Sequence, residues 1–157
     1  MPRTASLVVV ILLVFAFSVR YALAATDPCS LLTQAQVSEA LGASVGPGKL
    51  VVPTLCGWSE ATKKPGTTVK KVTLTLKKPQ EFAYLKMPVG NGITKTPVSG
   101  IGDEAVYGTT PGYATTLSVR KGDNVFVLQV WGFDLKKDAD QITAREKTLA
   151  LEVLSKL

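Results

Sequence analysis

Nucleophilic catalysis is the first chemistry to consider, because Ser59, Ser99 and Ser118 could each supply a hydroxyl group. The 157 residues, however, include no histidine. Without an imidazole, Ser-His-Asp triads and the commonest zinc ligand sets are excluded. A hydrolase would need serine, lysine or carboxylate groups that converge in one cleft. We therefore expect a protein that is not an enzyme and that holds no cofactor.

The segment GIGDEA, residues 100–105, combines two glycines with two adjacent carboxylates. A phosphate-binding loop would need a strand before it and a helix after it, whereas the residues that follow favour a strand. Side chains of neighbouring strand residues point to opposite faces, so Asp103 and Glu104 are not expected to share one ion. A calcium site would need more oxygen ligands. We predict a tight turn that starts a strand, with Gly100 and Gly102 providing unusual backbone angles, and we expect no metal site.

Cys29 and Cys56 are the two cysteines of the chain. Two cysteines in an exported protein indicate one disulfide bond. Free thiols and a shared metal ion are the alternatives, but two cysteines without histidine and without a CxxC motif make a poor metal site. The sequence therefore predicts a structural disulfide between Cys29 and Cys56.

The first 24 residues have the features of a signal peptide. Arg3 is followed by an apolar run over residues 7–17 and by Ala-Leu-Ala at residues 22–24, which predicts cleavage after Ala24. An uncleaved membrane anchor is the alternative, although a spanning helix needs about 20 apolar residues and Arg20 interrupts this one. Cleavage would leave residues 25–157 as a single secreted or periplasmic domain without a membrane span.

The composition of the chain is that of a folded domain, with 46% hydrophobic and 19% charged residues. A helix is predicted from a capping box at Thr33 and Gln36 to Gly42. Alternation and β-branched content predict strands over residues 55–59, 69–76, 105–107, 115–119 and 125–131. Residues 80–87 are ambiguous, and residues 88–97 are expected to form a loop. Apolar periodicity predicts a final helix over residues 138–157.

This order of elements predicts an α+β domain. An antiparallel sheet of about five strands would carry a short N-terminal helix and a long C-terminal helix.

Basic and aromatic residues are the candidates for binding a partner. Lysine doublets recur at residues 63–64, 70–71, 77–78 and 136–137 and could form a face for an anionic envelope polymer, although a solvated surface explains them as well. Nucleic acid is not expected, because no basic motif is interleaved with aromatic residues. Trp58 is predicted to pack beside the disulfide. The possible ligand or partner surface consists of Tyr107, Tyr113, Trp131 and Phe133.

Three motifs occur in order along the chain: DPCSLLT at residues 27–33, CGW at residues 56–58 and GIGDEA. Together they resemble the signature of small exported bacterial proteins of unknown function, many of them lipoproteins, with a PsbP-like α/β sandwich. The similarity runs from Asp27 to the terminal helix. Many relatives place a further lipobox cysteine before the DPC motif, and this sequence has none. The resemblance implies a fold and a place in the cell envelope, and it provides no catalytic residues.

Two functions are compatible with these features. The first is a non-enzymatic accessory protein of the cell envelope, which binds an unknown protein or an anionic polymer through its sheet face or connecting loops. The second is a carrier that holds a small apolar or amphipathic ligand between sheet and helix.

Overall fold

Seven strands and three α-helices make up the domain, which we describe from a computed structural model that covers residues 26–62, 65–66, 68–88, 90, 92–110 and 114–157. The elements follow one another as the 3₁₀ turn η2 (Pro28–Ser30), α2 (Gln34–Leu41), β1 (Lys49–Val52), β2 (Leu55–Ser59), β3 (Lys71–Lys77), α3 (Glu81–Lys86), β4 (Thr94–Val98), β5 (Glu104–Thr110), β6 (Ala114–Lys121), β7 (Asn124–Trp131) and α4 (Leu135–Leu154). The predicted signal peptide, residues 1–24, lies outside the described residues.

All strands form one antiparallel sheet in the order β1-β2-β3-β7-β6-β5-β4. The predicted α+β class is confirmed, whereas the expected number of about five strands is wrong. Both unpredicted strands, β1 and β4, lie at the edges of the sheet. The predicted loop over residues 88–97 in fact contains most of β4, whose Pro97 is tolerated because an edge strand has one unpaired side.

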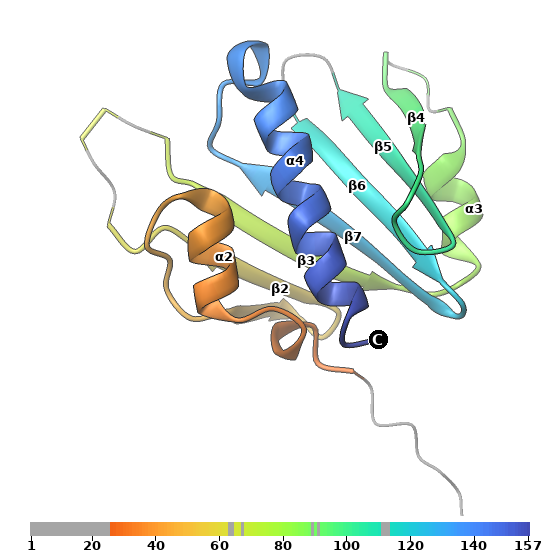
Figure 1. Cartoon of the computed structure of the whole chain (residues 1–157), viewed down its shortest axis with the longest axis horizontal. Helices are drawn as coiled ribbons and strands as arrows, with labels where there is room; N and C mark the ends of the chain where they lie inside the picture. The colour runs from red at the N-terminus through yellow and green to blue at the C-terminus, as the bar shows by residue number, and fades with distance from the viewer. Residues whose placement is uncertain (1–25, 63–64, 67, 89, 91, 111–113) are drawn as a thin grey trace, which may run out of the picture.

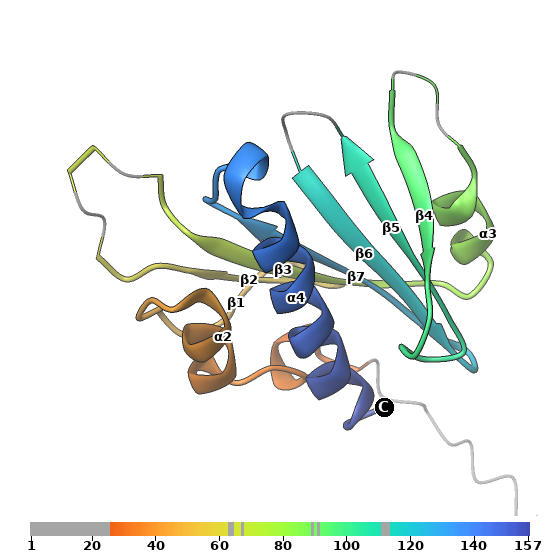
Figure 2. The ribbon, with the colours of Figure 1, turned by 45° about the horizontal axis from the view of Figure 1, so that its top comes forward.

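Helices cover the two faces of the sheet unequally (Figures 1 and 2). α2 and α4 lie on one face, and the core is packed between them and the strands. α3 lies on the opposite face, near β5 and β6. The fully buried side chains of the main core include Leu41, Trp58, Leu74, Leu117, Phe126, Leu128, Ile142 and Leu149.

Local signals set the ends of α2 as predicted. The Thr33 side chain accepts a hydrogen bond from the Gln36 N–H, and the Gln36 side chain accepts one from the Thr33 N–H, which completes the capping box. Gly42 ends the helix in the left-handed conformation, with φ of 58°.

Helix α4 begins earlier than the sequence suggested. The helix is predicted over residues 138–157, whereas Asp134 is its N-cap, with a side chain that accepts a hydrogen bond from the Lys136 N–H. The predicted apolar stripe packs on the sheet through Ile142, Leu149 and Val153. Within the described ranges, no helix is long and apolar enough to cross a membrane.

The disulfide forms between Cys29 and Cys56, whose Cα atoms are 5.1 Å apart. It joins η2 to β2. A Cβ atom placed on Gly48 would lie 2.7 Å from the Trp58 ring and 2.9 Å from the Cys56 sulfur, so the chain passes closely over both side chains. Trp58 is 1% exposed, which confirms that it packs in the core beside the disulfide.

The GIGDEA segment forms the predicted turn before β5. Gly100 and Gly102 have φ of 78° and 60°. The Asp103 carboxylate accepts a hydrogen bond from the Gly122 N–H at 2.7 Å, so it fastens this turn to the β6–β7 hairpin. A Cβ atom on Gly102 would lie 2.5 Å from the carbonyl oxygen of Arg120.

Gly102→Ala is therefore expected to lower the free energy of unfolding by about 2 kcal/mol, from backbone strain together with displacement of the Arg120 carbonyl group. Gly100→Ala is the matched control. It places a side chain at a similar φ, but nothing lies within 4 Å of the added atom, so it is expected to cost about 1 kcal/mol. Urea denaturation of both variants measures the difference, and equal losses would show that the close approach at Gly102 is unimportant.

Candidate functional site

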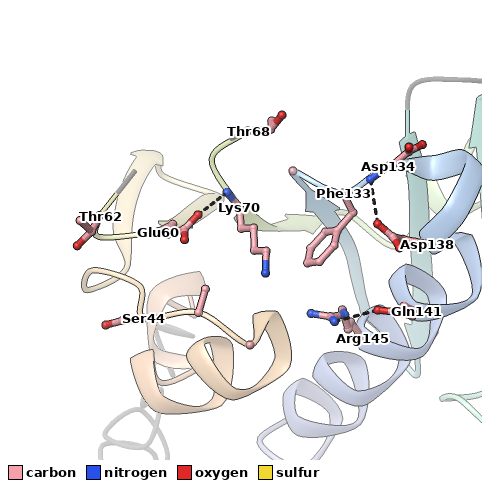
Figure 3. Close-up of a pocket in the computed structure, with 13 residues that line it drawn as sticks. Ser44, Glu60, Thr62, Thr68, Lys70, Phe133, Asp134, Asp138, Gln141 and Arg145 are labelled. Carbon is pink, nitrogen blue, oxygen red and sulfur yellow. Dashed lines mark hydrogen bonds between the residues drawn. The ribbon is translucent and has the colours of Figure 1, made fainter. Parts of the chain in front are cut away.

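An open cleft of about 890 Å³ lies where the C-terminal end of α2 meets the N-terminal half of α4 (Figure 3). Residues of three connecting segments form its walls: residues 42–44 after α2, residues 60, 62, 68 and 70 between β2 and β3, and residues 132–134 between β7 and α4. Asp138, Gln141 and Arg145 contribute from α4.

Phe133 is the aromatic residue of this cleft, and two cations lie beside its ring. The Lys70 Nζ atom is 4.9 Å from the ring centroid, and the Arg145 guanidinium carbon is 4.5 Å from it. Both distances are within the range of cation–π attraction. Figure 3 shows these three half-buried side chains close together. Lys70 immediately precedes β3, Phe133 lies in the connection between β7 and α4, and Arg145 belongs to α4.

The two cations also hold the end of α2. The Lys70 ammonium group donates to the Leu41 carbonyl oxygen at 3.1 Å, and the Arg145 guanidinium group donates to the Ala40 carbonyl oxygen at 2.8 Å. The last carbonyl groups of a helix have no hydrogen-bond partner within the helix, and these two side chains provide one. Their positive charges also interact favourably with the negative end of the helix dipole. Packing of α2 on α4 thus fixes the position of both cations.

Three carboxylates of the cleft are engaged by backbone groups. Glu60 accepts a hydrogen bond from the Lys70 N–H, Asp134 from the Lys136 N–H, and Asp138 from the Asp134 N–H. Within the described part of the chain, neither Lys70 nor Arg145 forms an ion pair with a carboxylate. Lysine has three N–H donors and arginine has five, so donors remain to bind an anionic group.

The three serines considered as nucleophiles lie apart from one another in the described part of the chain. Ser59 and Ser99 are exposed on separate elements. Ser118 and Lys121 have Ser-x-x-Lys spacing, but alternation along β6 points them to opposite faces, and the Lys121 ammonium group donates to the Leu154 carbonyl oxygen. Among the residues that the structure covers, no group of three or more histidine, cysteine or acidic side chains could hold a metal ion.

The predicted aromatic surface is divided between separate places. Phe133 lies in the cleft. Trp131, 37% exposed, is on the opposite face of the sheet, where Lys71 lies over its ring at 5.9 Å. Tyr107 lies under α4 and donates to the Thr143 carbonyl oxygen at 2.7 Å; burial, with a contribution from Glu146, raises its pKa to about 12. Tyr113 lies outside the described residues.

A buried carboxyl group lies below α4. The Glu146 side chain is fully buried beside Val130 of β7, beyond Leu117 and Leu128, which form the last pair in the register of β6 and β7. One oxygen accepts a hydrogen bond from the Val130 N–H at 3.2 Å, and the other has no well-formed hydrogen bond to any described residue. Burial raises the pKa of Glu146 to about 8, although the Val130 N–H and the Thr115 hydroxyl group lower it.

Sequence reasoning missed this residue, yet a signal was present. Glu146 interrupts the apolar stripe of α4 between Ile142 and Leu149, at helical spacing from both. A carboxyl group at such a position must be buried, so it must either find partners or be protonated.

Comparison with known proteins identifies no relative: no family model matches the chain, and neither a curated protein nor a solved structure matches it.

Proposed function

We infer that this protein is an exported, non-enzymatic interaction protein of the cell envelope, with the PsbP-like fold implied by its three motifs. In this proposal, an acidic segment of a partner protein enters the cleft. The observation that carries the proposal is the pair of cations beside Phe133, which have spare donors and no carboxylate partner among the described residues.

Several features support export. The disulfide between Cys29 and Cys56 is a kind of bond that persists in oxidising compartments. Residues 1–24 have the basic start, apolar run and Ala-Leu-Ala ending of a signal peptide. Both are compatible with a protein secreted or held in the periplasm.

The geometry favours binding of an anion at this cleft for a physical reason. Lys70 and Arg145 are held in place by the end of α2, so little side-chain freedom would be lost when a ligand binds. A carboxylate near both cations would form charge-assisted hydrogen bonds, and an apolar or planar group beside it could pack on Phe133.

No specific observation favours the carrier alternative. The hollows formed by the described residues lie at the surface, and the space between α4 and the sheet contains fully buried side chains such as Leu117, Phe126 and Leu149.

Hexaglutamate and its uncharged counterpart hexaglutamine provide the test. We expect calorimetric titration at low salt to detect binding of hexaglutamate and no binding of hexaglutamine. Lys70→Gln should weaken this binding at least fivefold because it removes a cleft donor. Lys71→Gln removes the same charge from the neighbouring residue on the other face of the sheet, and should have little effect.

Equal losses in the two variants would contradict the proposal, because they would indicate attraction to net charge instead of to the cleft. Absence of hexaglutamate binding to the wild-type protein would contradict it as well. Circular dichroism of Lys70→Gln should show that α2 persists, because loss of the hydrogen bond to Leu41 could otherwise account for the weaker binding.

A further inference from the structure

Strand β1 exposes a continuous apolar segment at one edge of the sheet. Its residues Leu50, Val51 and Val52 are consecutive, and they are 56%, 66% and 50% exposed. Pro53, in the tight turn to β2, is exposed as well. We call residues 50–55 the apolar edge. Three consecutive aliphatic side chains in contact with solvent are uncommon in a folded domain and indicate a binding surface.

The apolar side chains of this edge lie on both faces of the sheet. In the register of β1 and β2, Leu50 is on the face that carries α2 and α4. Val52 lies opposite Leu55 on the other face. Val51 is also on that face, where its side chain is 3.6 Å from the place that a Cβ atom of Gly57 would occupy. Apolar groups therefore surround the edge of the sheet.

This arrangement indicates the kind of partner. Addition of a protein strand is disfavoured, because Pro47 and Pro53 flank β1 and the register of the strand is shifted between Leu50 and Val52. A flat protein surface would cover the apolar groups of one face and leave those of the other face in water. A lipid layer, by contrast, surrounds an inserted edge on both faces.

Two cations border the apolar edge. Lys49 directly precedes Leu50 and is exposed. The Thr54 carbonyl oxygen accepts a hydrogen bond from the Leu76 N–H at 2.7 Å, so the turn lies against the end of β3, where Lys78 is exposed. Within the described residues, neither lysine forms an ion pair with a carboxylate. Positive charge beside an apolar segment favours a lipid surface with anionic headgroups.

The apolar edge also lies beside the start of the described chain. Thr26 and Asp27 line a shallow hollow of about 440 Å³ together with residues 50–53. The Asp27 carboxylate accepts a hydrogen bond from the Cys29 N–H at 2.9 Å, so it is engaged within the chain. The predicted leader ends at Ala24, close to this hollow in the sequence. A leader that enters the membrane during export would bring the apolar edge to the lipid surface.

We propose that the apolar edge inserts into the surface of a membrane that contains anionic phospholipids. Its three exposed aliphatic side chains would lie just below the headgroups, and Lys49 and Lys78 would contact lipid phosphates. Such binding depends on apolar area together with charge, and it is reversible. The apolar hollow shares no lining residue with the cleft around Phe133, so this proposal does not depend on the binding of an acidic segment there.

Sedimentation with phospholipid vesicles tests the proposal. The protein is used with its disulfide formed and its leader removed, as checked by mass, because an attached leader would itself bind lipid. We expect binding to phosphatidylglycerol vesicles and at least fivefold weaker binding to phosphatidylcholine vesicles. Val51→Thr/Val52→Thr keeps the shape of both side chains but adds hydroxyl groups, and should weaken the binding to phosphatidylglycerol at least fivefold.

Met87→Gln is the matched control. Met87 is also an exposed apolar residue, 52% exposed, but it directly follows α3, which lies near β5 and β6, across the sheet from β1. This variant should bind phosphatidylglycerol vesicles as the wild-type protein does.

Val52→Trp measures insertion directly. Brominated phosphatidylglycerol should quench the fluorescence of the added indole ring. The wild-type protein should be quenched little, because Trp58 is buried and Trp131 pairs with Lys71, at the opposite end of β3 from Lys78. Circular dichroism would detect a folding defect in Val51→Thr/Val52→Thr, and Val52→Trp then preserves the test.

Four results would overturn the proposal: no binding to phosphatidylglycerol vesicles, equal binding to phosphatidylcholine, unchanged binding in Val51→Thr/Val52→Thr, or no quenching in Val52→Trp. A wild-type dimer that dissociates in the double variant would also overturn it, because the edge would then bind a second copy of the chain. Lys70→Gln should bind vesicles normally, and the double variant should bind hexaglutamate normally. Failure of this proposal is therefore distinguishable from failure of the cleft.

Discussion

At pH 8 the Glu146→Gln variant is expected to be more stable than the wild-type protein, by about 4 kcal/mol. Below about pH 8 the native state keeps a proton on Glu146, because burial raises the pKa of its carboxyl group from 4.5 to about 8. The unfolded chain loses this proton near pH 4.5. Glutamine has the same shape and stays neutral at every pH.

The sign of the effect follows from proton binding. Between pH 4.5 and pH 8 the native state binds one proton more than the unfolded state, so the free energy of unfolding falls as pH rises, by about 1.4 kcal/mol per pH unit. The stabilisation is fully present below pH 4.5 and is lost by about pH 8. In Glu146→Gln this contribution is absent, so the stability of the variant should depend much less on pH.

Urea denaturation at pH 5, 6, 7 and 8 measures this dependence. Glu104→Gln is a suitable control, because Glu104 is half-exposed and bound to Lys86 and Arg120, which hold its pKa below the usual range. In that variant the free energy of unfolding should fall with rising pH as steeply as in the wild-type protein. Parallel curves for the wild-type protein and Glu146→Gln would refute the assignment of a neutral carboxyl group below α4.

Breaking the disulfide is expected to have an effect of similar size. Cys29 and Cys56 are 27 positions apart, and a loop of this length predicts a loss of about 3–4 kcal/mol on chain-entropy grounds. The melting temperature should fall by about 10–15 °C in a domain of this size. Thermal unfolding with and without dithiothreitol measures the loss.

The double variant Cys29→Ala/Cys56→Ala serves as a comparison for the reduced protein. Cys56 is fully buried, so the variant also loses packing, whereas reduction of the wild-type protein removes only the bond. We expect the double variant to be at least as unstable as the reduced protein. Identical melting temperatures for oxidised and reduced wild-type protein would show that the bond contributes nothing.

Local chemistry explains which elements could be predicted from the sequence. Thr33, Gln36 and Gly42 define α2 through contacts within a few residues, and Gly100 and Gly102 define their turn in the same way. The strands β3 and β7 have clear alternation because each has one buried face.

Edge strands could not be predicted in this way. All four residues of β1 are exposed, so the strand has no periodic pattern and exists because β2 pairs with it. β4 contains a proline, which normally indicates a loop. The cleft was missed for a related reason: Lys70 and Arg145 are far apart in the sequence, and only the packing of α2 against α4 brings them to Phe133.

The strand order has a consequence for how the chain acquires its structure. β3 pairs with β2 on one side and with β7, which lies much later in the sequence, on the other. α4, which completes the core, follows β7. Contacts between distant segments form slowly, because a long loop must close before they are made. A polypeptide that emerges with its N-terminus first would therefore stay incompletely folded until its last segments appear, and this delay would suit passage through a narrow translocation channel.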